Sequence, residues 1–130
     1  MKHNVILTIT SLLSILFMTF HLSDDIVRGF EKGGVSNLTA VPILVTWLYA
    51  TLVLAERRSG YVIVFLGSLL GAYVPYLHFK AAGGVVGRGI AASSGALFWV
   101  WTLLTIGVTA LFSVILAVRG LLSPQLGQSR

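Results

Sequence analysis

Three side chains in this sequence could hold a cation together, namely His21, Asp25 and His78. Zinc, copper and iron accept imidazole nitrogens and carboxylate oxygens as ligands, and a histidine beside an acid can also hold a proton. On a helix, His21 and Asp25 lie one turn apart and share a face. His78 lies far along the chain, so a shared site requires two separate elements to bring both histidines to one place.

Four apolar stretches can supply those elements, and they cover residues 5–22, 38–55, 61–79 and 96–118. Each is long enough, at about 1.5 Å of rise per residue, to cross roughly 30 Å of hydrocarbon as a helix. We therefore predict an all-α fold: an integral membrane four-helix bundle that forms a single domain from two antiparallel helical hairpins, with a flexible tail over residues 120–130. Odd-numbered spans leave the membrane on the same side, so His21 and His78 should lie at the same membrane face.

The composition excludes several classes of function. Hydrophobic residues make up 56% of the chain and charged residues 10%, against about 25% charged residues in a soluble domain. The net charge of +5 does not indicate a nucleic-acid partner, because the lysines and arginines are spread along the chain. There is no cysteine, which excludes thiol chemistry and thiolate metal ligands. Common hydrolase, metalloprotease and dinucleotide-binding motifs are missing, so a non-catalytic protein is favoured.

Two helical stripes are expected to face the bundle interior and to carry the histidines. The stripe on the first stretch holds Ser11, Ser14, Met18, His21 and Asp25, and the stripe on the third holds Gly67, Gly71, Val74 and His78. The two glycines form a G-x-x-x-G pair, which permits close helix packing. If both stripes meet, the imidazoles should approach each other with Asp25 as the nearest acid. The pair could then bind a divalent metal, or haem b between the two rings. The alternative is a wet helix end without any cofactor.

A third stripe consists of hydroxyl side chains on the fourth stretch: Thr102, Thr105, Thr109 and Ser113. Such a line could guide a solute or a proton, but its commoner use is hydrogen bonding between helices. No acid or base lies deep in any stretch, which disfavours an ion-coupled transporter. Trp99 and Trp101, near the start of the same stretch, are expected at the membrane interface.

The positive charges predict the orientation of the protein in the membrane. One side carries Lys2, Arg57, Arg58, Arg119 and Arg130, and the other carries Arg28, Lys32, Lys80 and Arg88. The bias is small, but the short turn with two adjacent arginines favours the cytoplasm. Both termini are therefore predicted to be cytoplasmic, with the histidines at the outer face and the first helix retained.

The segment from His21 to Glu31, with the sequence HLSDDIVRGFE, resembles the first outer loop of small bacterial inner-membrane proteins that have no assigned activity. The turn from Glu56 to Gly60 fits the same resemblance, which then covers nearly the whole chain. The resemblance implies a four-span fold and a bacterial inner membrane. It implies no activity and no site residues.

Three functions remain open. The first is a non-catalytic small subunit or scaffold of a larger membrane assembly, whose partners are the lipid bilayer and other membrane subunits or further copies of the chain. The second is a protein that binds a metal or haem b through His21 and His78 at the outer face. The third is a small transporter or channel lined by the serine and threonine stripes.

Overall fold

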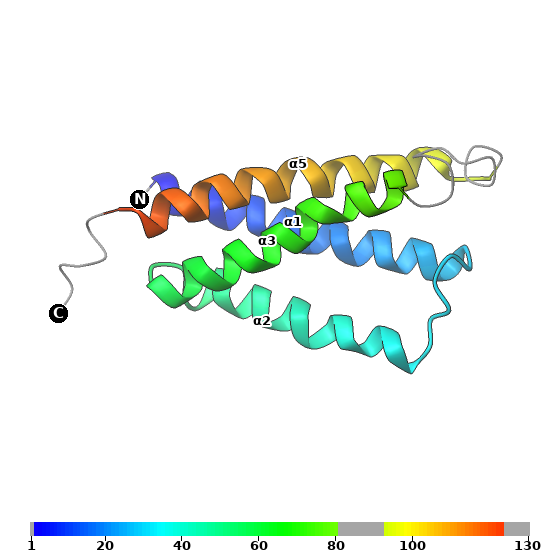
Figure 1. The fold of residues 1–130 in the computed structure, drawn as a ribbon, viewed down its shortest axis with the longest axis horizontal. Helices are drawn as coiled ribbons and strands as arrows, with labels where there is room; N and C mark the ends of the chain where they lie inside the picture. The colour runs from blue at the N-terminus through cyan, green and yellow to red at the C-terminus, as the bar shows by residue number, and fades with distance from the viewer. Residues whose placement is uncertain (1, 81–92, 124–130) are drawn as a thin grey trace.

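The computed structural model describes residues 2–80 and 93–123, and this part of the chain contains helices and no strand (Figure 1). In chain order the elements are α1 (Lys2–Val27), the 3-10 helix η1 (Val35–Thr39), α2 (Ala40–Leu52), α3 (Arg58–Lys80) and α5 (Ala96–Leu121). Within these described residues, four segments are long and apolar enough to cross a membrane: Asn4–Val27, Val35–Leu52, Arg58–His78 and Ala96–Leu121. The predicted all-α membrane fold with four packed helices is therefore confirmed.

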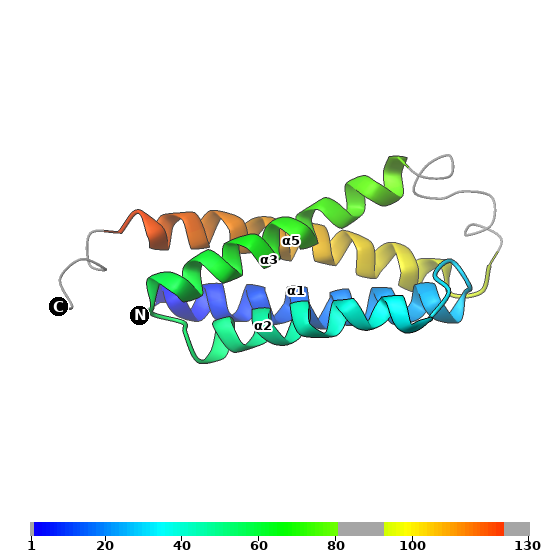
Figure 2. The same ribbon diagram turned by 60° about the horizontal axis from the view of Figure 1, so that its bottom comes forward.

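Successive helices run in opposite directions along the bundle (Figure 2). The start of α1, the α2–α3 turn and the end of α5 lie together at one end of the molecule. The ends of α1 and α3 and the start of α5 lie at the opposite end, which we call the histidine end because it contains His21 and His78. Helix α5 packs along both α1 and α3, while α2 packs against α3 and α1.

The outside of the bundle is covered by large apolar side chains. Leu66 and Phe112, for example, are each 55% exposed. Such surfaces would drive aggregation in water, whereas in a bilayer they contact acyl chains. The main apolar core is formed by Leu7, Ile15, Trp47, Ala50, Tyr61, Val64 and Ala117. The bundle thus has the distribution of polar and apolar surface that a membrane protein requires.

Helix α1 extends one turn beyond the predicted first stretch, which was expected to end at residue 22. The Arg28 Nε atom donates to Asp24 Oδ2 at 2.7 Å, and a pair at this spacing stabilises an additional helical turn. Gly29, with φ of +74°, then ends the helix, and the Phe30 N–H donates to the Asp25 carbonyl oxygen at 2.9 Å. This is a Schellman cap. The first histidine therefore lies inside the helix rather than at its end.

The turn between α2 and α3 also lies earlier than predicted. The second span covers Val35–Leu52 instead of residues 38–55, and α3 begins at Arg58 instead of residue 61. Gly60 permits α3 to begin close to the preceding turn, because a Cβ atom at this position would lie only 1.9 Å from the Leu54 carbonyl oxygen. Glycine lets the first turn of the helix rest directly on the backbone of the turn.

The end of α5 lies later in the sequence than predicted. The helix reaches Leu121, so the predicted tail over residues 120–130 begins as helix. Residues 124–130 of that tail lie outside the described part of the chain.

Candidate metal site

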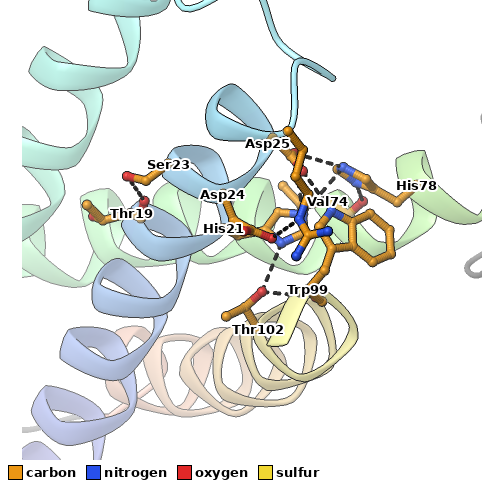
Figure 3. Close-up of polar contacts among 10 residues, drawn as sticks. Thr19, His21, Ser23, Asp24, Asp25, Val74, His78, Trp99 and Thr102 are labelled. Atoms are coloured by element: carbon orange, nitrogen blue, oxygen red, sulfur yellow. Dashed lines mark hydrogen bonds and ion pairs between the residues drawn. The ribbon is translucent and has the colours of Figure 1, made fainter. Parts of the chain in front are cut away.

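The histidine end of the bundle brings three potential ligands from two helices to one point. His21 and Asp25 project from α1 and His78 projects from α3 (Figure 3). The Nε2 atom of His21 lies 3.4 Å from His78 Nε2 and 3.6 Å from Asp25 Oδ2. The Nε2 atom of His78 lies 3.3 Å from the same Asp25 oxygen. The predicted approach of the two imidazoles, with Asp25 as their shared acid, is therefore confirmed.

Hydrogen-bond partners determine which nitrogen of His78 carries a proton. Its Nδ1 atom lies 2.9 Å from the Val74 carbonyl oxygen one turn earlier on α3. A carbonyl oxygen can only accept, so His78 Nδ1 must donate. In the neutral imidazole, Nε2 is then unprotonated and directs its lone pair toward Asp25 and His21.

The same reasoning applies to His21. Its Nδ1 atom lies 3.0 Å from Thr102 Oγ1, and this hydroxyl donates its own proton to the Trp99 carbonyl oxygen at 2.9 Å. The hydroxyl oxygen therefore accepts from His21 Nδ1, which leaves His21 Nε2 unprotonated in the neutral imidazole. When both rings are neutral, each histidine thus presents an Nε2 lone pair to one carboxylate oxygen, whereas a protonated His78 Nε2 would donate to Asp25 Oδ2 at 3.3 Å.

Trp99 completes the surroundings of the site, and the sequence did not indicate this role. Trp99 is only 2% exposed and faces the bundle interior, whereas Trp101 is 58% exposed. An interfacial depth stays a prediction for both indoles. The Trp99 Nε1–H donates to Asp25 Oδ1 at 2.7 Å, and its ring centroid lies 5.3 Å from each imidazole. Trp99 lies one helical turn before Thr102, which begins the hydroxyl stripe. This spacing was the signal in the sequence that Trp99 faces the bundle interior.

The three ligand groups are shielded to different degrees. The side chain of His21 is 3% exposed and that of Asp25 is 7% exposed, whereas that of His78 is 28% exposed. The site is therefore open on the side of α3. Burial of a polar or charged group without a compensating charge or hydrogen bond raises the free energy of the folded state. The three ligand atoms therefore need a proton or a metal ion among them.

A second polar contact fixes the start of α5 next to the site. Asp24 points away from Asp25 and binds Arg28, whose Nη1 atom donates to Ser93 Oγ at 2.7 Å. The Arg28 side chain also packs against Gly95, where a Cβ atom would lie 2.6 Å from Nη2. Arg28 thus holds the end of α1 against the residues that precede α5.

The triangle of ligand atoms has the size of a metal site. In a tetrahedral site with bonds of about 2.0–2.1 Å, neighbouring ligand atoms lie about 3.3–3.4 Å apart. The three separations of 3.3, 3.4 and 3.6 Å agree with this value. Ligands at right angles around an octahedral ion with the same bond lengths would lie about 2.8–3.0 Å apart. Both Nδ1–H groups and the second carboxylate oxygen are hydrogen-bonded to neighbouring groups. Such hydrogen bonds, made by the ligand atoms that do not bind the ion, are also typical of metal sites.

The geometry does not fit the haem hypothesis. Two axial histidines on opposite sides of a haem iron have ligand nitrogens about 4 Å apart, with the porphyrin between them. Here the two Nε2 atoms are 3.4 Å apart and the imidazole centroids only 4.8 Å apart. The Trp99 ring packs against both imidazoles, so the described residues leave no slot for a macrocycle at this point.

The two glycines of α3 permit close packing, but against two different helices. A Cβ atom on Gly67 would lie 2.5 Å from Trp47 Cδ2 on α2, and one on Gly71 would lie 3.1 Å from the Ala110 Cβ atom on α5 and 3.3 Å from Trp47 Cη2 on α2. His78 instead meets side chains of α1 and α5. The residues of the predicted stripe, from the two glycines to His78, therefore contact three neighbouring helices rather than one.

The hydroxyl stripes of α1 and α5 bind each other. Ser14 donates to Thr109 at 2.9 Å, and Ser113 donates to Thr10 at 2.9 Å. Ser11 is also fully buried and pairs with a threonine and a tryptophan of α2. Such pairing supports the packing interpretation. Two other residues of the predicted α5 stripe have different partners. Thr102 Oγ1 forms a hydrogen bond with His21, and the Thr105 carbonyl oxygen accepts one from the Thr109 hydroxyl.

No protein-family model, curated protein or solved structure matches this chain.

Proposed function

We propose that this protein is an integral membrane protein that binds a divalent transition-metal ion through His21, Asp25 and His78. The observation that carries the proposal is the convergence of three lone pairs, at 3.3–3.6 Å, whose other polar atoms are already engaged. Three such acceptors repel one another unless a cation lies among them.

A metal ion satisfies this arrangement better than a proton does. A proton on His78 Nε2 would divide one donor between Asp25 Oδ2 at 3.3 Å and His21 Nε2 at 3.4 Å, and both hydrogen bonds would be long. A metal ion accepts all three lone pairs at once. The support for a metal is therefore the number of acceptors together with their spacing.

The ligand types indicate which ions the site would prefer. Two imidazoles and one carboxylate suit borderline ions such as Zn²⁺, whereas Mg²⁺ and Ca²⁺ favour sites built only from oxygen. The tetrahedral spacing further favours Zn²⁺, which has no geometric preference from its d electrons and adopts four-coordinate sites.

Metal analysis of the purified protein in detergent tests this proposal. We expect one Zn²⁺ per chain after loading and removal of excess metal, and loss of this ion in both His21→Ala and His78→Ala. The chain has three histidines, so His3→Ala is the matched control and should retain the ion. Retention of the ion by both site variants, or its absence from a folded parent with native helicity, would contradict the proposal.

A second candidate function is a small subunit of a larger membrane assembly. It is favoured by α2, which buries only Trp47, Ala50 and Thr51 and exposes most of its other residues. An apolar groove follows the boundary between α2 and α3, and it is lined by Pro42, Ile43, Thr46, Trp47, Ile63, Leu66, Gly67 and Leu70. Cross-linking through cysteines introduced on α2, in native membranes, tests this candidate. A product no larger than the monomer would argue against it.

We also propose a bacterial inner membrane as the location, with both termini cytoplasmic. The support is the resemblance of the HLSDDIVRGFE segment and the position of Arg57 and Arg58 at the end of the bundle where α1 begins and α5 ends. A reporter that is active only in the periplasm, fused after Arg130, should be inactive. Activity of that fusion would reverse the orientation and place the histidine end in the cytoplasm.

A further inference from the structure

The number of protein ligands at the candidate site decides what else the bound ion can contact. Among the residues that the structure describes, only His21, Asp25 and His78 bring ligand atoms within 4.8 Å of one another. A tetrahedral ion needs four ligands, and a closed structural zinc site takes all four from the protein. One position therefore has to be filled by another group.

The polar groups around the triangle do not supply a fourth ligand. Thr102 Oγ1 is engaged by His21 and by the Trp99 carbonyl, and the indole nitrogen of Trp99 is a donor only. The Val74 carbonyl oxygen accepts from His78 Nδ1. Each group next to the ligands is thus committed to orienting a ligand and has no lone pair directed at the centre of the triangle.

The two remaining acids near the site have other positions. The Asp24 carboxylate is held at 2.7 Å by Arg28, on a different face of α1 from Asp25. Glu31 lies beyond the Schellman cap and is exposed. Glu31 is therefore the protein group that a test must exclude as a hidden fourth ligand.

The exposure of the ligands indicates where an external ligand could enter. The side chains of His21 and Asp25 are almost fully covered by α1, α3 and α5, whereas the His78 side chain is 28% exposed. Access to the ion is thus from the His78 side, at the histidine end of the bundle. A small molecule can approach there without separation of the helices.

We propose that the metal ion held by His21, Asp25 and His78 keeps its fourth coordination position for an exchangeable small ligand, namely water or a small anion. This inference rests on the proposed metal binding. Three protein ligands with one exchangeable position is the arrangement of zinc sites that act as Lewis acids, in contrast to closed structural sites. The site would then bind and polarise a small oxygen or nitrogen ligand rather than only stabilise the fold.

The test uses Co²⁺ as a visible probe in the full-length protein in detergent. Bound tetrahedral Co²⁺ should give intense visible absorption bands, and titration with azide should shift these bands with a saturable dependence on concentration. The same titration is made on Glu31→Gln, which keeps the size of the side chain and removes its charge. We expect the shift in both proteins, with azide affinities within about threefold of each other.

Each outcome has a distinct meaning. A shift in Glu31→Gln but not in the parent would show that the Glu31 carboxylate closes the site, and this would overturn the inference. A Co²⁺ spectrum insensitive to azide in both proteins would overturn it as well, because the fourth position would then not be exchangeable. Absence of any Co²⁺ or Zn²⁺ binding would instead refute the proposed function itself.

Discussion

Replacing Trp99 by phenylalanine removes one hydrogen-bond donor from the candidate metal site and keeps an aromatic ring in place. In the parent, the Trp99 Nε1–H donates to Asp25 Oδ1 at 2.7 Å, while Asp25 Oδ2 faces the two histidines. The bond therefore fixes the direction in which the carboxylate presents its free oxygen. Without it, the carboxylate can rotate away from the imidazoles and loses a partner in a position that water reaches poorly.

The expected loss of Zn²⁺ affinity in Trp99→Phe follows from two independent ranges of measured effects. Hydrogen bonds to charged groups contribute about 1.5–3 kcal/mol. Loss of a partner that orients a metal ligand lowers metal affinity by about 10–100-fold. At 1.4 kcal/mol per factor of ten, this is about 1.4–2.8 kcal/mol, so the two ranges agree. Because the bond is short and the Asp25 side chain is only 7% exposed, we expect a loss in the upper part of this range.

The assay is a competition titration of Zn²⁺ between the protein and a chromophoric chelator in detergent. Trp101→Phe is the matched control, because Trp101 lies two positions further along the same helix and is 58% exposed. The control should bind Zn²⁺ within about twofold of the parent. If Trp99→Phe also binds within twofold, while circular dichroism shows unchanged helicity, the argument that Trp99 orients the carboxylate is wrong.

Three further predictions concern packing and protonation. Gly67→Ala places a methyl group 2.5 Å from the Trp47 ring and should destabilise the bundle by about 1–3 kcal/mol in thermal unfolding, whereas Gly34→Ala, with nothing within 4 Å, should change little. Ser14→Ala removes one hydrogen bond to Thr109 and should cost about 0.6 kcal/mol in unfolding experiments, and a cost above 2 kcal/mol would mean that the hydroxyl does more than pack. Zn²⁺ affinity should fall as the pH is lowered from about 8 to about 5, because protons compete with the ion for both imidazoles. An affinity that does not change over this range would exclude histidine ligands.

The sequence by itself determined the class of protein and the approximate position of the histidines. Span length and apolarity are local properties, so four stretches could be identified without knowledge of how they pack. The number of crossings then placed His21 and His78 at the same end, and helical periodicity placed Asp25 on the face of His21. These inferences depend only on the order of residues along the chain and on the geometry of one helix.

Only the tertiary structure decided how each helix is rotated about its own axis and which neighbour each face meets. Trp99 and Trp101 are both indoles at the start of α5, yet one is buried against Asp25 and the other is exposed, because packing against α1 selects one face of α5. Likewise, Gly67 and Gly71 belong to one sequence motif, but Gly67 lies against Trp47 of α2, whereas Gly71 lies against both Ala110 of α5 and Trp47. The spacing of the three ligand atoms is a further result of this kind, because it requires the rotations of α1 and α3 to be set together. A helix in a bilayer has no polar solvent around it to fix its rotation, so the packing of all four helices determines it.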